Sequence, residues 1–255
     1  ESHLWRVVYT GEESTVPVGP EVNAEAQEAR QLRHQLESFH GEEDARALPA
    51  AWPHLDSQDR FIRHAARVAV EWQPVEEWAE RALNEDRPQA RITGLTALAR
   101  TASEDYRDRA LESLLEMDVE ALTPDQKLGY LRALSLVFQR LGSPNQEQGE
   151  QIADKLQPIL PHEDDRVNVE LVRVLVFLED ERVIDKALTL MEEESEPPIL
   201  DWDSTLLSRS ERYGGTIQEI QENPPPTFKL EYAFMLRNMP YGWTMEQRRR
   251  YFTFI

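Results

Sequence analysis

Apolar residues along most of this chain recur every three or four positions, the spacing that places them on one face of an α-helix. The densest case is residues 163–180, EDDRVNVELVRVLVFLED, where an apolar run lies between two acidic ends. Most other periodic segments begin at a residue that commonly caps or opens a helix, namely Asn23, Ser57, Pro74, Asp86, Thr123 or Ser143. The pattern predicts eight or more helices of about 10 to 18 residues, joined by short loops.

Four of these helices begin with an acidic or polar residue followed by a basic one. The basic residues, called anchors below, are Arg60, Arg87, Lys127 and Arg166. They are 27, 40 and 39 residues apart, and the last two intervals match helical-hairpin repeats of about 40 residues. Apolar or small residues follow each anchor at similar offsets: Ala65 and Val68, Ile92 and Leu95, Leu131 and Leu134, Leu171 and Val174. The chain is therefore expected to repeat one unit, which is shortened in the first interval.

The repeats predict an all-α fold, a HEAT-like α-solenoid of stacked helical hairpins. One hairpin cannot bury its own apolar face, so neighbouring hairpins must supply a core for each other. The acidic residue near each helix start favours the positive end of the helix dipole. The anchor beside it is expected to form an ion pair with an acidic residue of the adjacent repeat.

The two ends of the chain differ from this repeat. Residues 4–10, LWRVVYT, favour a pleated environment and predict one short β-strand, followed by an extended linker. A single strand needs a partner to be stable. The last sixty residues are rich in aromatic side chains, are interrupted by Pro and Gly, and predict a helical C-terminal cap. The expected division is an N-terminal segment at 1–20, helical repeats at 21–195 and the cap at 196–255.

The charge and cysteine content narrow the function classes. The formal net charge is -20, which disfavours a nucleic-acid partner and adsorption to an anionic membrane. The chain has no cysteine, which excludes disulfides, a catalytic thiol and covalent haem attachment within it. It also lacks an apolar run of about 18 residues, so no membrane insertion is expected.

No set of residues points to catalysis, a metal or a cofactor within this chain. The six histidines show none of the spacings typical of metal ligands. The stretch HEDD at 162–165 could attract a cation, but a helix-capping loop is the simpler interpretation. Arg248–Arg250 form the only basic cluster in the sequence. Three consecutive helical positions point to different faces, which favours separate ion pairs over a phosphate site.

Five aromatic residues near the C-terminal end form a candidate contact surface between domains. Aromatic side chains supply a large apolar area, and Tyr and Trp also carry a polar atom, so they are common at such contacts. Two interpretations are open: the set packs against a following domain, or it forms a local core. The five residues are Trp202, Tyr213, Trp243, Tyr251 and Phe252.

Particular stretches of the chain resemble a known family. LWRVVYTGEESTVPV resembles the end of a six-bladed propeller of the sorbosone/glucose dehydrogenase-like type. The stretches WPHL, RYGGTI and GWT with RRRYF are similar to the HEAT-repeat linker of large bacterial multidomain proteins, which joins such a propeller to a c-type cytochrome module. The resemblance implies haem c in a following domain of the parent protein and a periplasmic or secreted location. The haem motif CxxCH is missing here, so the implied redox chemistry belongs to other parts of that parent.

The expected function is architectural and non-catalytic: a segment that spaces a propeller from a cytochrome c module and contacts these neighbouring domains, or another protein. One alternative is a stand-alone HEAT-repeat binding module with an acidic groove for a peptide or a cationic partner. A second alternative is a HEAT-like DNA glycosylase. That enzyme needs a basic groove, and the net charge of -20 opposes it.

Overall fold

The computed structural model describes residues 3–17, 19, 23–193 and 226–254. All regular structure in these residues is helical, which confirms the all-α prediction at this level. The α-helices are α1 (Ala24–Glu37), α2 (Ala47–Ala51), α3 (Arg60–Glu71), α4 (Val75–Leu83), α5 (Pro88–Thr101), α6 (Arg107–Glu116), α7 (Pro124–Arg140), α8 (Gln146–Leu156), α9 (Asp165–Phe177), α10 (Arg182–Glu192), α13 (Thr227–Leu236) and α14 (Met245–Phe254). Three short 3₁₀ helices are η1 (Trp52–His54), η2 (Glu104–Tyr106) and η3 (Gln157–Ile159).

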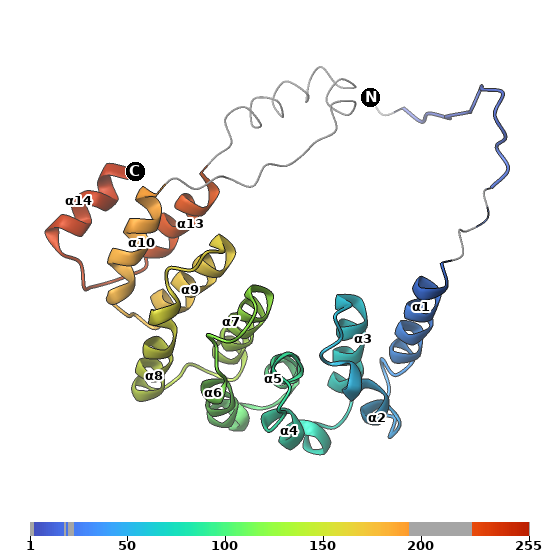
Figure 1. The fold of residues 1–255 in the computed structure, drawn as a ribbon, viewed down its shortest axis with the longest axis horizontal. Coiled ribbons are helices and arrows are strands. Elements are labelled where there is room, and N and C mark those ends of the chain that lie inside the picture. Colours follow the sequence, from blue (N-terminus) through green and yellow to red (C-terminus); the bar gives the residue numbers. More distant parts are fainter. Residues whose placement is uncertain (1–2, 18, 20–22, 194–225, 255) are drawn as a thin grey trace.

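The helices are arranged as successive hairpins along an arc (Figure 1). Helices α1, α3, α5, α7, α9 and α13 contact one another in this order and form the inner layer of the arc. Each of these helices from α3 onward also contacts the second helix of the preceding hairpin, so α5 lies on α3 and α4, and α13 lies on α9 and α10. Every hairpin therefore covers the exposed groove of the hairpin before it.

One hydrophobic core runs through all the hairpins, from Leu36 in α1 to Met239 after α13. Most apolar positions that follow the anchors in sequence are buried in it, including Ile92, Leu134 and Leu171, whereas Val68 is only half-buried. Since each hairpin shares this core with its neighbours, burial of apolar surface holds the hairpins in a fixed order.

Small residues allow two close approaches between helices. A Cβ atom on Gly94 of α5 would lie 3.2 Å from the Cβ atom of Ala82 in α4. A Cβ atom on Gly129 of α7 would lie 3.1 Å from Cγ2 of Ile92 in α5. Larger side chains at these two glycines would push the hairpins apart, because close-packed interiors leave little room for added atoms.

Several helix starts carry a side-chain cap, although not always from the expected residue, and α5 begins without one, after Arg87 rather than Asp86. Thr123 forms the predicted capping box with Gln126 at the start of α7. Asp59 rather than Ser57 caps α3, and Asn145 rather than Ser143 caps α8. Both residues lie immediately before the helix and accept backbone N–H groups of the first turn, which the earlier serines do not reach.

The strand predicted for residues 4–10 is not formed in this structure. These residues have no regular structure, and Leu4, Trp5 and Val7 are exposed to solvent. A strand requires a neighbour for its backbone hydrogen bonds, and the described residues offer none. At the other end, α13 and α14 form the described part of the C-terminal cap, while Trp202 and Tyr213 lie outside the described residues.

Candidate functional site

The anchor Arg87 is the centre of a network that joins the first two hairpins. Its Nη1 lies 2.9 Å from Oδ1 of Asp56, an acidic residue of the preceding hairpin, and its Nε lies 3.0 Å from Glu85. The Glu85 carboxylate also accepts a hydrogen bond of 2.7 Å from Nε1 of Trp52, which is fully buried. The Arg87 guanidinium, helped by the Trp52 N–H, lowers the pKa of Glu85 to about 2, against the opposing effect of burial.

This pKa makes Glu85 a pH-dependent contributor to stability. Because the pKa falls from an ordinary 4.5 to about 2 on folding, the contribution is complete above about pH 4.5 and is lost as the pH falls toward 2. We expect acid to reduce the free energy of unfolding of the wild type more steeply in this range than that of Glu85→Gln. Urea titrations at several pH values measure both, and parallel curves would contradict the prediction.

The other anchors differ in their partners. Arg166 lies 2.7 Å from Asp164 and 3.5 Å from Asp125, the latter in the preceding hairpin. Lys127 does not reach an acid: its side chain is buried, and Nζ donates to the carbonyl oxygen of Leu122 at 2.6 Å. The guanidinium of Arg60 lies 4.7 Å from the ring centroid of Phe61 and forms no ion pair with a described residue. The expected pairing across repeats is thus found at two anchors and is wrong for Lys127 and Arg60.

The exposed rows of the inner-layer helices carry arginines as well as acids. In α7, the exposed and half-buried residues recur at helical spacing and form one row along the helix. Arg132 belongs to this row and forms no ion pair with a described residue. Between α7 and α9 lies a cavity of about 270 Å³, where Arg173 pairs with Glu231 of α13 at 3.3 Å. The exposed ring of Phe177 stacks on Phe138 beside it, with centroids 5.1 Å apart.

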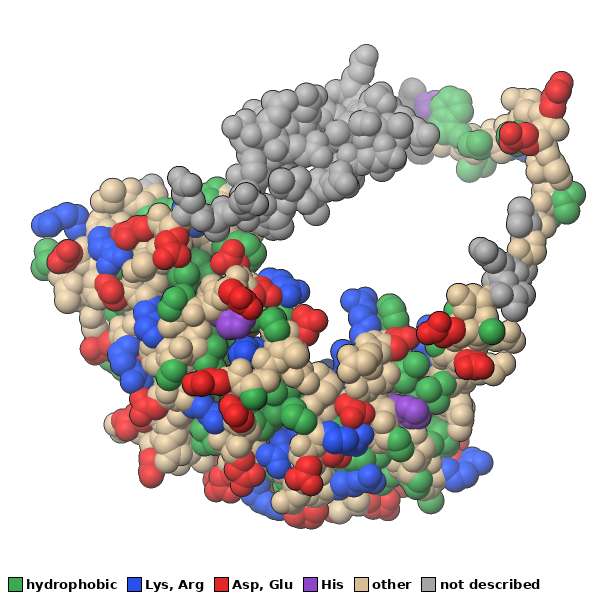
Figure 2. All heavy atoms as spheres, in the orientation of Figure 1, with side chains coloured by type: hydrophobic (Ala, Val, Ile, Leu, Met, Phe, Trp, Pro, Cys, Tyr) green, Lys and Arg blue, Asp and Glu red, His purple; other side chains and the backbone are tan. Residues whose placement is uncertain are grey.

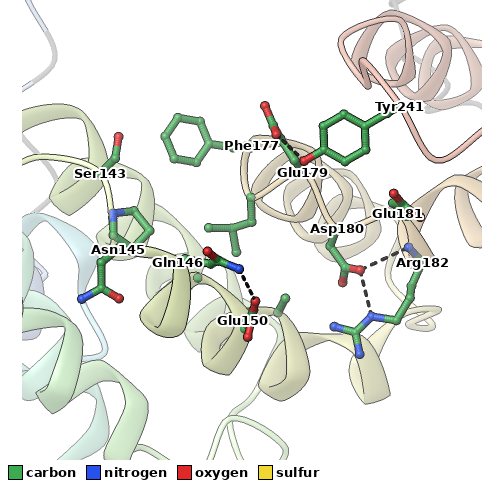
Figure 3. A pocket seen from close by; sticks show the side chains of 14 residues that line it. Ser143, Asn145, Gln146, Glu150, Phe177, Glu179, Asp180, Glu181, Arg182 and Tyr241 are labelled. Carbon is green, nitrogen blue, oxygen red and sulfur yellow. Dashed lines mark hydrogen bonds and ion pairs between the residues drawn. The ribbon is translucent and has the colours of Figure 1, made fainter.

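A larger open groove of about 750 Å³ lies where the α9–α10 turn approaches the start of α8 (Figure 3). Three of its carboxylates are engaged by their neighbours, whereas the Glu181 side chain forms no ion pair with a described residue. Glu179 accepts a hydrogen bond of 2.6 Å from the Tyr241 hydroxyl, and this contact raises the pKa of Tyr241. Asp180 pairs with Arg182 at 2.8 Å, and Glu150 accepts from Gln146 at 3.0 Å. These contacts close the turn and dock Tyr241 onto it, so the groove is best explained as part of the fold.

Three of the five aromatic residues predicted as a contact surface come together at the C-terminal end. Trp243 and Tyr251 meet edge to face, with centroids 5.5 Å apart, and Tyr251 meets Phe252 in the same way at 5.5 Å. They line an open groove of about 450 Å³ between α13 and α14, called the terminal groove below. Arg237 and Arg248 also line it, with the apolar side chains of Leu236 and Met239 at its base.

The terminal groove is held by polar contacts to the rest of the fold. The Tyr251 hydroxyl donates to the carbonyl oxygen of Ala233 at 3.0 Å, and Trp243 Nε1 donates to that of Met239 at 3.0 Å. Arg250 fixes α14 to α10 through Asp185 at 2.6 Å and Glu192 at 2.7 Å. Of the basic cluster in the sequence, Arg250 therefore forms the expected ion pairs. Arg248 and Arg249 form none with described residues.

Sequence reasoning missed two groups that the structure brings together. Arg237 and Met239 belong to the terminal groove, although they lie between two helices and show no periodic pattern. Trp52 hydrogen-bonds to a side chain 33 positions away, which no local pattern indicates. The available sequence signal for the groove was Gly242, because glycine readily adopts the positive φ of a tight turn. In the structure its φ is 83°.

Nothing among the described residues resembles a metal site. No group of three His, Asp or Glu side chains is arranged to bind a metal ion in residues 3–17, 19, 23–193 and 226–254. In the HEDD stretch, Asp164 caps α9 by accepting the backbone N–H of Arg166 at 2.9 Å, which confirms the capping interpretation. No helix in the described part of the chain is long and apolar enough to cross a membrane. No protein-family model, curated protein or solved structure matches the chain.

Proposed function

We propose that this chain is a HEAT-like α-solenoid that acts as a non-catalytic spacer, holding other protein domains at a set separation. The observation that carries this proposal is the single core that runs from Leu36 to Met239 through every described hairpin. Bending such a stack would open apolar contacts at one or more hairpin interfaces, at a cost of about 25 cal/mol for each Å² exposed. The stack is therefore expected to resist bending.

Polar contacts across hairpins support the same function. Arg87 with Asp56, Arg109 with Glu80 and Arg182 with Asp154 join residues 31, 29 and 28 positions apart in neighbouring hairpins, at 2.9, 2.6 and 2.7 Å. Exposed pairs of this kind add little stability singly, but they oppose sliding of one hairpin over the next. Following the family resemblance, we propose that the separated domains are a dehydrogenase-like propeller and a c-type cytochrome in a periplasmic or secreted protein.

The alternative of a binding module with an acidic groove has less support. The exposed rows of the inner-layer helices α5, α7 and α9 carry Arg100, Arg132 and Arg173. The acidic residues of these rows, Asp125 and Glu170, and Glu71 at the end of α3 all accept ion pairs from arginines. Figure 2 shows acidic and basic side chains interspersed on the visible face rather than separated into an acidic surface.

The spacer function predicts a narrow distribution of end-to-end distances. Since the chain has no cysteine, dyes can be attached at two introduced ones, Glu28→Cys in α1 and Glu246→Cys in α14. Single-molecule energy transfer should give one narrow population. The matched control is a pair within one hairpin, His64→Cys with Glu76→Cys, which defines the width of a rigid unit. An end-to-end distribution several-fold wider than that of the control contradicts the proposal.

A further inference from the structure

In each earlier hairpin, the surface that corresponds to the terminal groove is covered by the first helix of the next hairpin. The first helix of each following hairpin lies across both helices of the hairpin before it: α5 on α3 and α4, α7 on α5 and α6, α13 on α9 and α10. The equivalent surface of the last hairpin, between α13 and α14, receives no helix among the described residues. By the packing rule of this chain, the natural occupant of the groove is one further α-helix.

The groove offers apolar contacts that such a helix would bury. Phe252 of α14, which lines the groove, is 70% exposed, whereas the exposed Met245 at the start of α14 lies outside the lining. Trp243 and Tyr251 line the groove beside Phe252. Aromatic side chains gathered in one hollow, rather than scattered singly, are typical of contact sites. The groove is also preformed, since Tyr251, Trp243 and Arg250 fix α14 in place.

The charge of the groove is opposite to that of the chain. Arg237 and Arg248 line it, no acidic side chain does, and neither arginine has an ion-pair partner among the described residues. Elsewhere most arginines face a carboxylate, and the whole chain carries a net charge of -20. An apolar hollow beside two unpaired arginines complements an occupant that carries both apolar and acidic side chains.

We propose that the terminal groove binds an amphipathic α-helix of a separate protein, with apolar residues on one face and acidic residues flanking them. The apolar residues enter between Trp243 and Phe252, and the acidic residues reach Arg237 and Arg248. A second copy of this chain is a poorer occupant, because a two-fold contact through this end would place the same arginines opposite one another. This inference does not depend on the spacer function, because peptide binding by the groove and the end-to-end distance of the stack are measured separately.

The test uses the whole chain and a synthetic fluorescent peptide of about 16 residues that carries Leu and Phe at i, i+3, i+4 and i+7 with flanking Glu residues. Fluorescence anisotropy should show saturable binding. The variants Phe252→Ser and Arg248→Glu should each weaken binding about tenfold or more, because they remove an apolar anchor and a complementary charge. The same peptide with Lys in place of Glu should also bind at least about tenfold more weakly.

Arg249→Glu is the matched control, because Arg249 is exposed on the same helix, undergoes the same change of charge and does not line the groove. It should change the affinity less than about twofold. Equal losses for Arg248→Glu and Arg249→Glu, or no binding by the wild type, overturn the proposal. Sedimentation equilibrium gives the third outcome: a dimer that Phe252→Ser dissociates would make a second copy the occupant and would likewise overturn it. Thermal unfolding checks that each variant folds.

Discussion

The substitution Trp52→Ala is expected to lower the free energy of unfolding by about 3 to 5 kcal/mol. The Trp52 side chain is 0% exposed, and the Arg81 guanidinium lies 4.4 Å from its ring centroid. Its loss leaves a cavity between the first two hairpins and removes the 2.7 Å hydrogen bond to the Glu85 carboxylate. Urea denaturation followed by circular dichroism measures the change.

Trp72→Ala is the matched control for this prediction. Trp72 lies at the C-terminal end of α3 and is 50% exposed, so the same change of residue removes much less buried surface. We expect a loss of about 1 kcal/mol or less. If the two substitutions destabilise the protein equally, the buried network around Trp52 does not contribute as proposed.

The effect of Trp52→Ala should also be local. In a stack of hairpins each unit contacts only its neighbours, so a lost contact weakens the nearest interface first. Amide hydrogen exchange should therefore accelerate in α1 to α4 while α9 and α10 keep their protection. A uniform acceleration would indicate that the array unfolds as a single cooperative unit.

The features that could be predicted from the sequence depend on residues that lie only a few positions apart in the chain. Helical periodicity identified Ile92, Leu134 and Leu171 as buried positions, and all three are. The capping boxes at Thr123 and Thr244 involve residues only three positions apart, so the sequence contains both partners of each. The regular spacing of the anchors likewise marked the helices that form the inner layer from α3 to α9.

The features that were not predictable depend on residues distant in sequence. Arg250 meets Asp185 across 65 positions, and no local pattern distinguishes it from Arg248, which lines the terminal groove instead. Arg87 is the residue before α5, whereas Lys127 lies inside the first turn of α7, where its Nζ donates to the carbonyl oxygen of Leu122 in the preceding loop. Such choices follow from the path of each loop, which composition and periodicity do not specify.

The aromatic candidates illustrate both cases. The local-core interpretation describes Tyr251 and Trp243, and the contact with another domain stays a prediction. Tyr251 and Trp243 are partly buried and hydrogen-bonded within the cap, whereas Phe252 remains exposed at the edge of the groove. The sequence identified the residue types, but only the packing of α14 on α10 and the hydrogen bond from Tyr251 to α13 determine which ring faces outward.

Asn168→Leu is expected to cost about 2 to 4 kcal/mol, because it leaves two backbone polar groups without partners at a largely buried place. The Asn168 side chain is 1% exposed and clamps the loop before α9: Oδ1 accepts the backbone N–H of His162 at 2.7 Å, and Nδ2 donates to its carbonyl oxygen at 2.8 Å. The control Asn145→Leu makes the same change at an exposed helix cap and should cost about 1 kcal/mol. Urea denaturation compares the two, and equal losses would show that the clamp adds nothing beyond an ordinary cap.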